Sequence, residues 1–314
     1  MKNPIYLDYN ATTPIDPRVK DAMLPYLGEH FGNPSTNYVY GQRAREVLEQ
    51  AREQIAALIA ARPEEIVFTS GGSESDNHAI IGAALANAHK GKHIITSRIE
   101  HPAVLNTCRY LEERLGFTVT YLSVDEHGLL APEKVRRAIR PDTILVTVMH
   151  ANNEVGTVEP IEEIGEITRE RGILFHTDAA QSCGKIEVDV NRLKVDLLTV
   201  AGHKLYAPKG VGALFIRNGT AIDSFIHGAG QEKCRRAGTE NVPYAVGLGA
   251  ACELARHELQ EYEGKVRDLR DRLYARIAQG LGSDKVHLNG HRERRLPNTL
   301  NISLQGIVGE ELLR

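Results

Sequence analysis

Short apolar segments alternate with amphipathic segments through the middle of the chain. Apolar runs of strand length, each followed by a segment of helical periodicity, are typical of βα units in a mainly parallel sheet with helices on both faces. The ligand site of such an α/β fold is expected at the carboxyl ends of the strands. We expect strands at 64–70, 93–97, 118–124, 143–150, 173–179, 195–203 and 211–215, and helices at 101–116, 131–139 and 161–172.

Two further helical segments flank this region. Residues 43–60 carry apolar side chains at helical spacing with a charged reverse face, which predicts a packing helix. A long charged helical stretch over 241–280 leads to a separate strand signal at 297–304. We therefore expect a large domain over residues 16–249 and a smaller α+β domain formed by residues 1–15 together with 250–314.

Composition and charge narrow the range of partners. The 314 residues are 42% hydrophobic and carry a net charge of −3 without any Lys/Arg block, which argues against nucleic acid or an anionic membrane as partner. No run approaches the ~18 apolar residues of a membrane span, and the first residues lack an apolar leader. Four cysteines without metal-type spacing fit a reducing compartment. We expect a soluble, cytoplasmic protein with a small-molecule ligand and no bound metal.

A lysine directly follows one of the expected strands. Lys204 lies between the apolar runs 195–203 and 211–215. Lysine is rarely buried unless it is paired or has a chemical role, because removing an ammonium from water is costly. Lys204 is therefore either a lysine whose amine reaches solvent or a nucleophile.

The segment FTSGGSES, residues 68–75, joins an expected strand to a helix. Glycines and a serine at a helix start expose backbone N–H groups and a hydroxyl, which suits a phosphate and makes Gly72 and Ser73 candidate ligands. The alternative is ordinary capping, with Ser73 as the N-cap and Glu74 in the first turn.

Other polar residues follow the same strands. Asp178 and Gln181 come after the strand at 173–179, His101 begins a helix, and Asn153 follows another strand. Each residue alone is explained by capping. Their joint placement with Lys204 at one sheet edge favours a site. A different hypothesis takes four of these strand-end residues as the metal ligands of a hydrolase, although no standard metal motif is matched: His150, His176, Asp178 and His203.

The set of groups at this edge matches the needs of pyridoxal 5′-phosphate (PLP). This cofactor requires an amine for its aldehyde, an acid for its pyridine nitrogen, an aromatic ring above it and donors for its phosphate. The chain resembles the cysteine desulfurases of the NifS/IscS kind, class V aminotransferases of PLP fold type I, and the related selenocysteine lyases. The resemblance rests on eight segments: YLDYNATTP, FGNPS, FTSGGSESDN, EHPAVL, HANNEVGT, HTDAAQSCGK, AGHKLYAPKGVGAL and RRAGTENV.

The resemblance implies roles for individual residues. Lys204 would bond the cofactor covalently, Asp178 would partner the pyridine nitrogen, and His101 would stack on the ring and transfer protons. Asn153 and Gln181 would lie near the phenolate edge and the substrate. The phosphate would be held by four residues, the last of them from the second subunit of a homodimer: Gly72, Ser73, His203 and Thr239.

Two departures from the family pattern stand out. Ala201 replaces a serine that many relatives carry, which removes one hydroxyl from the phosphate site. The family's sulfur-accepting cysteine and carboxylate-binding arginine lie beyond the last residues given, so we expect an incomplete small domain. Among the four cysteines, Cys108 and Cys252 fit helix packing, Cys183 offers little reach, and Cys234 is the candidate reactive thiol because basic residues flank it.

Three functional hypotheses remain. The leading one is a PLP-dependent desulfurase that converts L-cysteine to L-alanine and passes sulfur as a persulfide to an acceptor or scaffold protein for iron–sulfur cluster or related biosynthesis. A selenocysteine lyase-like enzyme is a variant of it. The second is a non-catalytic relative that acts as a binding or assembly partner. The third is the metal-dependent hydrolase.

Overall fold

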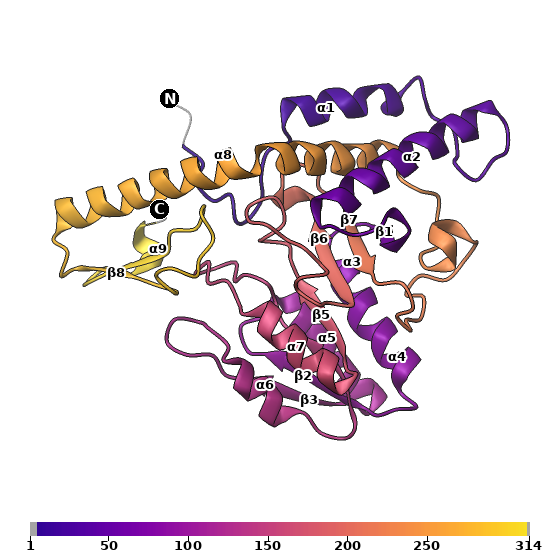
Figure 1. Cartoon of the computed structure of the whole chain (residues 1–314). Helices are drawn as coiled ribbons and strands as arrows, with labels where there is room; N and C mark the ends of the chain where they lie inside the picture. Colours follow the sequence, from indigo (N-terminus) through magenta and orange to yellow (C-terminus); the bar gives the residue numbers. More distant parts are fainter. Residues whose placement is uncertain (1–4, 313–314) are drawn as a thin grey trace.

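The computed structural model describes residues 5–312 and contains a seven-stranded sheet (Figure 1). The strands lie in the order β1-β7-β6-β5-β4-β2-β3, and β7 alone runs opposite to the other six. The predicted, mainly parallel α/β sheet is confirmed. Its strands are β1 (Ile66–Thr69), β2 (His93–Ser97), β3 (Thr118–Leu122), β4 (Thr143–Thr147), β5 (Leu174–Asp178), β6 (Leu197–Ala201) and β7 (Gly212–Ile216).

Helices form the crossovers between the parallel strands. The predicted helices correspond to α5 (Pro102–Leu115), α6 (Pro132–Ala138) and α7 (Ile161–Arg171). Proline at the first helical position suits α5 and α6, because its missing N–H would have no partner there. The helices α5 and α7 both end at a glycine in the left-handed conformation, which favours residues without a Cβ.

Apolar side chains are buried on both faces of the sheet. One face packs against α2 (Val39–Leu58), α7 and the first part of α8 (Val242–Leu281). The other face packs against α5 and a continuous helical segment formed by α3 (Gly72–Asn77), the π-helical turn η3 (His78–Gly82) and α4 (Ala83–Asn87). The helices α2 and α8 approach closely at Gly249, where a Cβ would lie only 2.6 Å from the Cα of Ala51. A glycine is therefore required at this contact.

The 40-residue helix α8 extends from the sheet towards the C-terminal part of the chain (Figure 1). Its buried residues all lie between Val242 and Cys252. The helix α1 (Pro17–Met23) also packs against α8. Its far end leads to the small sheet of β8 (Val286–Leu288) and β9 (Ile302–Leu304) and to α9 (Gly309–Leu312). The predicted boundary at 249/250 falls within α8, and the division into domains stays a prediction. Residues 1–4 and 313–314 of the predicted small domain lie outside the described residues.

Short 3₁₀ turns lie between some of these helices and strands. They are η1 (Leu24–Leu27), η2 (Pro63–Glu65), η4 (Gly202–Lys204) and η5 (Gln231–Cys234). Between residues 5 and 312 no helix is both long enough and apolar enough to cross a membrane.

Candidate active site

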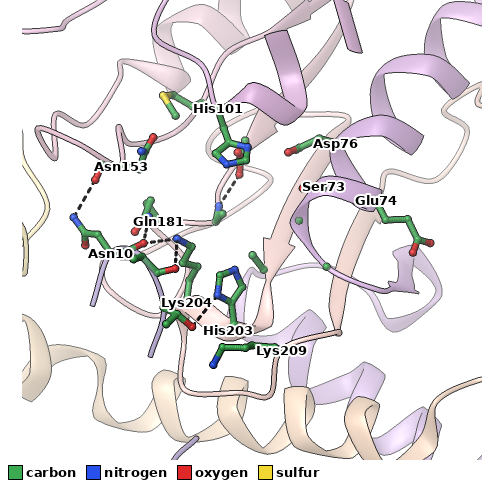
Figure 2. A pocket seen from close by; sticks show the side chains of 18 of the residues that line it. Asn10, Ser73, Glu74, Asp76, His101, Asn153, Gln181, His203, Lys204 and Lys209 are labelled. Carbon is green, nitrogen blue, oxygen red and sulfur yellow. Dashed lines mark hydrogen bonds between the residues drawn. The ribbon is translucent and has the colours of Figure 1, made fainter. Parts of the chain in front are cut away.

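A cavity of about 660 Å³ lies where the carboxyl ends of β4, β5 and β6 meet (Figure 2). Because β7 is antiparallel to both β1 and β6, β1 points in the same direction as the parallel strands, and the segment after it joins this edge. The N-terminal segment, residues 8–12, closes one side. Distant parts of the chain thus meet at one edge, as the strand pattern predicted.

Eight of the nine predicted site residues line this cavity. They are Gly72, Ser73, His101, Asn153, Asp178, Gln181, His203 and Lys204. Thr239 is exposed and is not among the lining residues. Their proximity follows from the topology, and their chemical roles remain predictions.

Lys204 ends the short turn η4 that follows β6. Its Nζ donates hydrogen bonds to the backbone carbonyl of Asn10 and, at 3.0 Å, to that of Ala11 (Figure 2). Partial burial lowers the pKa of Lys204, while the charges of Asp178, Asp8 and Glu154 oppose that shift. A lowered pKa increases the neutral amine, which is the nucleophilic form. This environment favours the nucleophile hypothesis over the solvent-directed lysine.

Two buried carboxyl groups line the cavity beside each other. Asp178 ends β5, and its Oδ1 accepts a hydrogen bond from the backbone N–H of Ala180 at 2.9 Å. Asp76 on α3 is 1% exposed, and its Oδ1 has no hydrogen-bond partner among residues 5–312. Burial raises the pKa of both groups, and the charge of Asp178 raises that of Asp76 further. Burial of the pair therefore favours the neutral form of a carboxyl, most of all at Asp76, where the charge of Asp178 adds to the effect.

His176 lies next to this acid pair. Its Nε2 is 3.7 Å from Oδ1 of Asp76, but burial lowers the pKa of His176 to about 3, so the ring is neutral and forms no ion pair. Asp76 was not predicted as a site residue, although it belongs to the quoted segment FTSGGSESDN.

His101 combines the two roles that the sequence left open. It is the N-cap of α5, and its Nδ1 accepts a hydrogen bond from the N–H of Ala103 at 3.1 Å. Its ring also lines the cavity. Because Nδ1 accepts, the proton of the neutral ring is on Nε2. The capping contact thus fixes the tautomer.

The helix start at α3 differs from the capping alternative. The N-cap is Gly71, with φ of 148°, and Ser73 lies inside the first turn, so the assignment of Ser73 as N-cap is wrong. A Cβ on Gly71 would meet nothing within 4 Å, whereas one on Gly72 would lie 3.2 Å from Cβ of Ala201. Glu74 accepts from the N–H of Ser70 at 2.8 Å. The first-turn N–H groups of Gly72 and Ser73 face no intrahelical acceptor.

Asn10 connects several parts of the site, and the sequence analysis did not identify it. Its backbone oxygen accepts from Lys204 and, at 2.9 Å, from Nε2 of Gln181. Its side chain joins three further residues: Nδ2 donates to the oxygen of Asn153 at 3.1 Å and to Oγ1 of Thr299 at 3.0 Å, and Oδ1 accepts from Asn298 at 2.8 Å. Only its place in the segment YLDYNATTP pointed towards the site.

The cysteines lie away from the cavity. Cys108, Cys183 and Cys252 are buried, and burial raises the pKa of all three thiols. Cys234 is exposed and does not line the cavity. Of the basic residues that flank it, Arg236 pairs with Glu74 at 2.8 Å.

The donor set of the cavity fits PLP. An anion would meet the N-terminus of the helical segment 72–87 together with His203 and Lys209, and a ring nitrogen would meet the buried Asp178. Lys204 supplies the amine. The alternative metal site is not supported, since residues 5–312 contain no group of three His, Cys, Asp or Glu side chains placed to hold an ion.

Comparison with known proteins decides the family. The model of the aminotransferase class-V family matches residues 5–314. The chain belongs to the class-V aminotransferase family. A family member from Methanosarcina thermophila, named cysteine desulfurase IscS, is 53% identical over 98% of this chain and 76% of its own length.

Solved structures of the family share the fold. A NifS-like protein superposes with a TM-score of 0.94 at 39% identity, covering 99% of this chain and 84% of its own. A structure described as SspA in complex with cysteine gives a TM-score of 0.85 at 40% identity, covering 96% of this chain and 84% of its own. The predicted resemblance to NifS/IscS-like proteins and the PLP fold type I are confirmed.

Proposed function

We propose that this chain is a PLP-dependent cysteine desulfurase. The observation that carries the proposal is the half-buried amine of Lys204 in a cavity that also holds the buried carboxyl of Asp178. The names of the relatives, cysteine desulfurase IscS, support the same reaction. L-cysteine as the substrate is supported by the cysteine complex of the structural neighbour SspA.

Each side chain of the cavity has a defined task in this proposal. PLP, when bound, supplies an aldehyde that bonds an amine and a ring that takes up the electron pair released at the substrate's α-carbon. Lys204 would hold the aldehyde in the resting protein and, once the substrate's amine has taken its place, its free Nζ would accept the α-proton. Asp178 would hold a proton at the ring nitrogen. His101, whose Nδ1 accepts from the N–H of Ala103, would cover the ring and take part in proton transfer at the substrate.

The reaction transfers one sulfur atom. The Cβ–S bond of L-cysteine breaks, the sulfur forms a new S–S bond with a thiol, and Cβ receives a proton, giving L-alanine and a persulfide. The thiol must lie in line with the substrate sulfur, and such positioning can supply ~7–11 kcal/mol of the barrier. Since no cysteine of residues 5–312 lines the cavity, we propose that the accepting thiol comes to it from outside these residues.

Further parts of the proposal concern the assembly. We infer a cytoplasmic homodimer in which Thr239 reaches the phosphate site of the second subunit; its exposure in the single chain supports this role. Exposed apolar side chains of the segment 24–40 offer surface for such contacts: Leu24, Leu27, Phe31, Tyr38, Val39 and Tyr40. The persulfide would pass to an acceptor or scaffold protein in iron–sulfur cluster or related biosynthesis.

The test is alanine formation from L-cysteine by the full chain with PLP, with dithiothreitol as the thiol. We expect alanine and sulfide in equal amounts, and a loss of at least 10³-fold in Lys204→Ala, because the nucleophile is removed. The exposed Lys20→Ala is the matched control.

The other hypotheses correspond to other outcomes. Bound PLP without alanine at any thiol concentration would favour the non-catalytic relative. A higher kcat/KM for L-selenocysteine than for L-cysteine would favour the lyase. Alanine formation that survives Lys204→Ala would contradict the proposal, and its loss in Cys234→Ser would make Cys234 the acceptor.

A further inference from the structure

A second lysine is buried directly behind the cavity. Lys185 lies in the turns after β5, is 3% exposed, and donates from Nζ to Oε1 of Gln181 at 2.7 Å. None of the ion pairs formed within residues 5–312 involves it. A lysine without a carboxylate is costly to bury, so its contact with Gln181 requires an explanation.

The contact belongs to a chain of hydrogen bonds that ends at Lys204. Gln181 accepts from Lys185 through Oε1 and donates through Nε2 to the carbonyl oxygen of Asn10 at 2.9 Å. Nζ of Lys204 donates to the same oxygen (Figure 2). An ammonium can only donate, so it holds Oε1 on its own side and leaves the amide N–H groups on the side of Asn10 and the cavity.

The two lysines also share a smaller cavity of about 180 Å³. Charged and titratable groups from α1, α8 and the segment after η4 face it, but Asp16 and Glu258 pair with Arg18 rather than with either lysine. The remaining titratable groups that line it are Tyr206 and Tyr262, and burial raises the pKa of both. The thiol of Cys183, two residues before Lys185, also has a pKa raised by burial. Among the groups that line this smaller cavity, no carboxylate therefore pairs with either lysine, while Asp178, Asp8 and Glu154 act on Lys204 from the side of the larger cavity.

We propose that Lys185 is a positioning residue, which fixes the amide of Gln181 as a donor to the cavity and, through Asn10, the place of the Lys204 amine. The inference deepens the proposed function and rests on it only where PLP is concerned. Burial and the charge of Lys204 lower the pKa of Lys185 to about 7. Removing the charge of Lys204 is expected to let Lys185 keep its proton to higher pH.

The first experiment needs no cofactor. Lysines of the full chain are labelled with ¹³C at Cε and titrated by NMR without PLP, and the signal of Lys185 is assigned with Lys185→Met. We expect a midpoint near pH 7 that rises by at least one pH unit in Lys204→Met. The exposed Lys20 is the internal reference and should not move. A midpoint of Lys185 that does not respond to Lys204→Met would overturn the coupling, whatever the protein catalyses.

The second experiment tests positioning through Gln181. In the resting protein with PLP, Lys185→Met should displace the N–H donor of Gln181 from the phenolate oxygen of the cofactor. We therefore expect PLP binding about tenfold weaker and a pH midpoint of the cofactor's visible band about one unit higher, because the oxyanion loses a hydrogen bond. Lys185→Arg, which keeps the charge and the donor, should restore most of both. In a Gln181→Met background the further change to Lys185→Met should have no effect.

The outcomes separate this inference from the proposed function. If Lys185→Met changes PLP binding and the pH midpoint equally with Gln181 present and in the Gln181→Met background, the positioning role is overturned. A protein that binds no PLP contradicts the proposed function, while the NMR titration still decides the coupling of the two lysines. If Lys185→Met does not fold, Lys185→Arg is compared with Lys185→Gln instead. Lys185→Gln should then bind PLP more weakly, with a higher pH midpoint, than Lys185→Arg.

Discussion

The floor and the rim of the active-site cavity differ in burial and in the elements that form them. The floor consists of Asp76, Asp178 and Gln181, each at most 7% exposed and each fixed next to a strand end or inside a helix. The rim includes His101 and Lys209, which are exposed and lie at a helix cap or in a loop. Charges on the floor act in a low dielectric, whereas rim contacts compete with water.

The difference indicates where single substitutions will have large effects. A buried charge controls the protonation of everything near it, and its removal changes the chemistry of the whole site. An exposed group contributes one hydrogen bond, which is worth ~0.5–1.5 kcal/mol. We therefore expect a large loss where a substitution removes a charge from the floor, and modest losses from rim variants that remove only a contact to the cofactor. His101 is an exception on the rim, because the proposed function gives its ring a part in proton transfer.

The largest expected effect separates the two floor carboxyls. Asp178→Asn should lower kcat/KM for alanine formation by roughly 10²–10⁴-fold, since the group that holds the ring proton is neutralised. Asp76→Asn should lower it less than tenfold, because burial and the charge of Asp178 raise the pKa of Asp76 and favour its neutral form, which asparagine mimics. The two substitutions are isosteric and serve as controls for each other. Equal losses would contradict the division of roles within the pair.

A smaller effect concerns Glu100 and the way in which the free energy of unfolding depends on pH. The carboxyl of Glu100 is buried and accepts from the N–H of Met149 at 2.9 Å, and burial raises its pKa to about 8. Its folded pKa lies above its unfolded value of about 4.5, so the folded state binds the extra proton and the free energy of unfolding falls as pH rises from about 4.5 to about 8. Glu100→Gln removes this dependence.

Denaturant unfolding at pH 5, 6.5 and 8 measures the effect. The stability of Glu100→Gln relative to the unsubstituted chain should increase with pH, by at most ~1.4 kcal/mol per pH unit. A constant difference across the three pH values would show that Glu100 titrates alike in the folded and unfolded states.

The sequence predicted the strands better than their arrangement. Buried runs such as 93–97 have little choice of structure, and β2 occupies those residues. That β7 lies between β1 and β6 and runs against both is a consequence of tertiary packing, for which local periodicity carries no signal. The strand ends nevertheless sufficed to gather eight predicted residues, since parallel strands deliver their carboxyl ends to one edge.

The residues that sequence reasoning missed share a physical reason. Asn10 acts at Lys204 through a backbone carbonyl, which every residue possesses. Asp76 lies inside a helix, where an acidic residue normally faces water, and Lys185 resembles any lysine after a turn. Their burial arises only when distant segments pack, so composition and spacing could not distinguish them from surface residues.

The smallest expected effect concerns the rim and the second subunit. Thr239 is exposed and does not line the cavity of its own chain. If it completes the phosphate site across the dimer, Thr239→Ala removes one hydrogen bond and should raise the dissociation constant of PLP roughly two- to twelvefold, the equivalent of ~0.5–1.5 kcal/mol.

Dimerisation and cofactor binding are then linked, because a ligand that binds only the dimer stabilises it by mass action. Sedimentation at decreasing protein concentration, with and without PLP, measures this linkage. PLP should increase the fraction of dimer, and Thr239→Ala should reduce that increase while leaving alanine formation at saturating PLP within a factor of a few. A monomer that binds PLP as tightly as the dimer would show that each chain completes its own phosphate site. The rim of the cavity would then be formed by a single subunit, as the floor is.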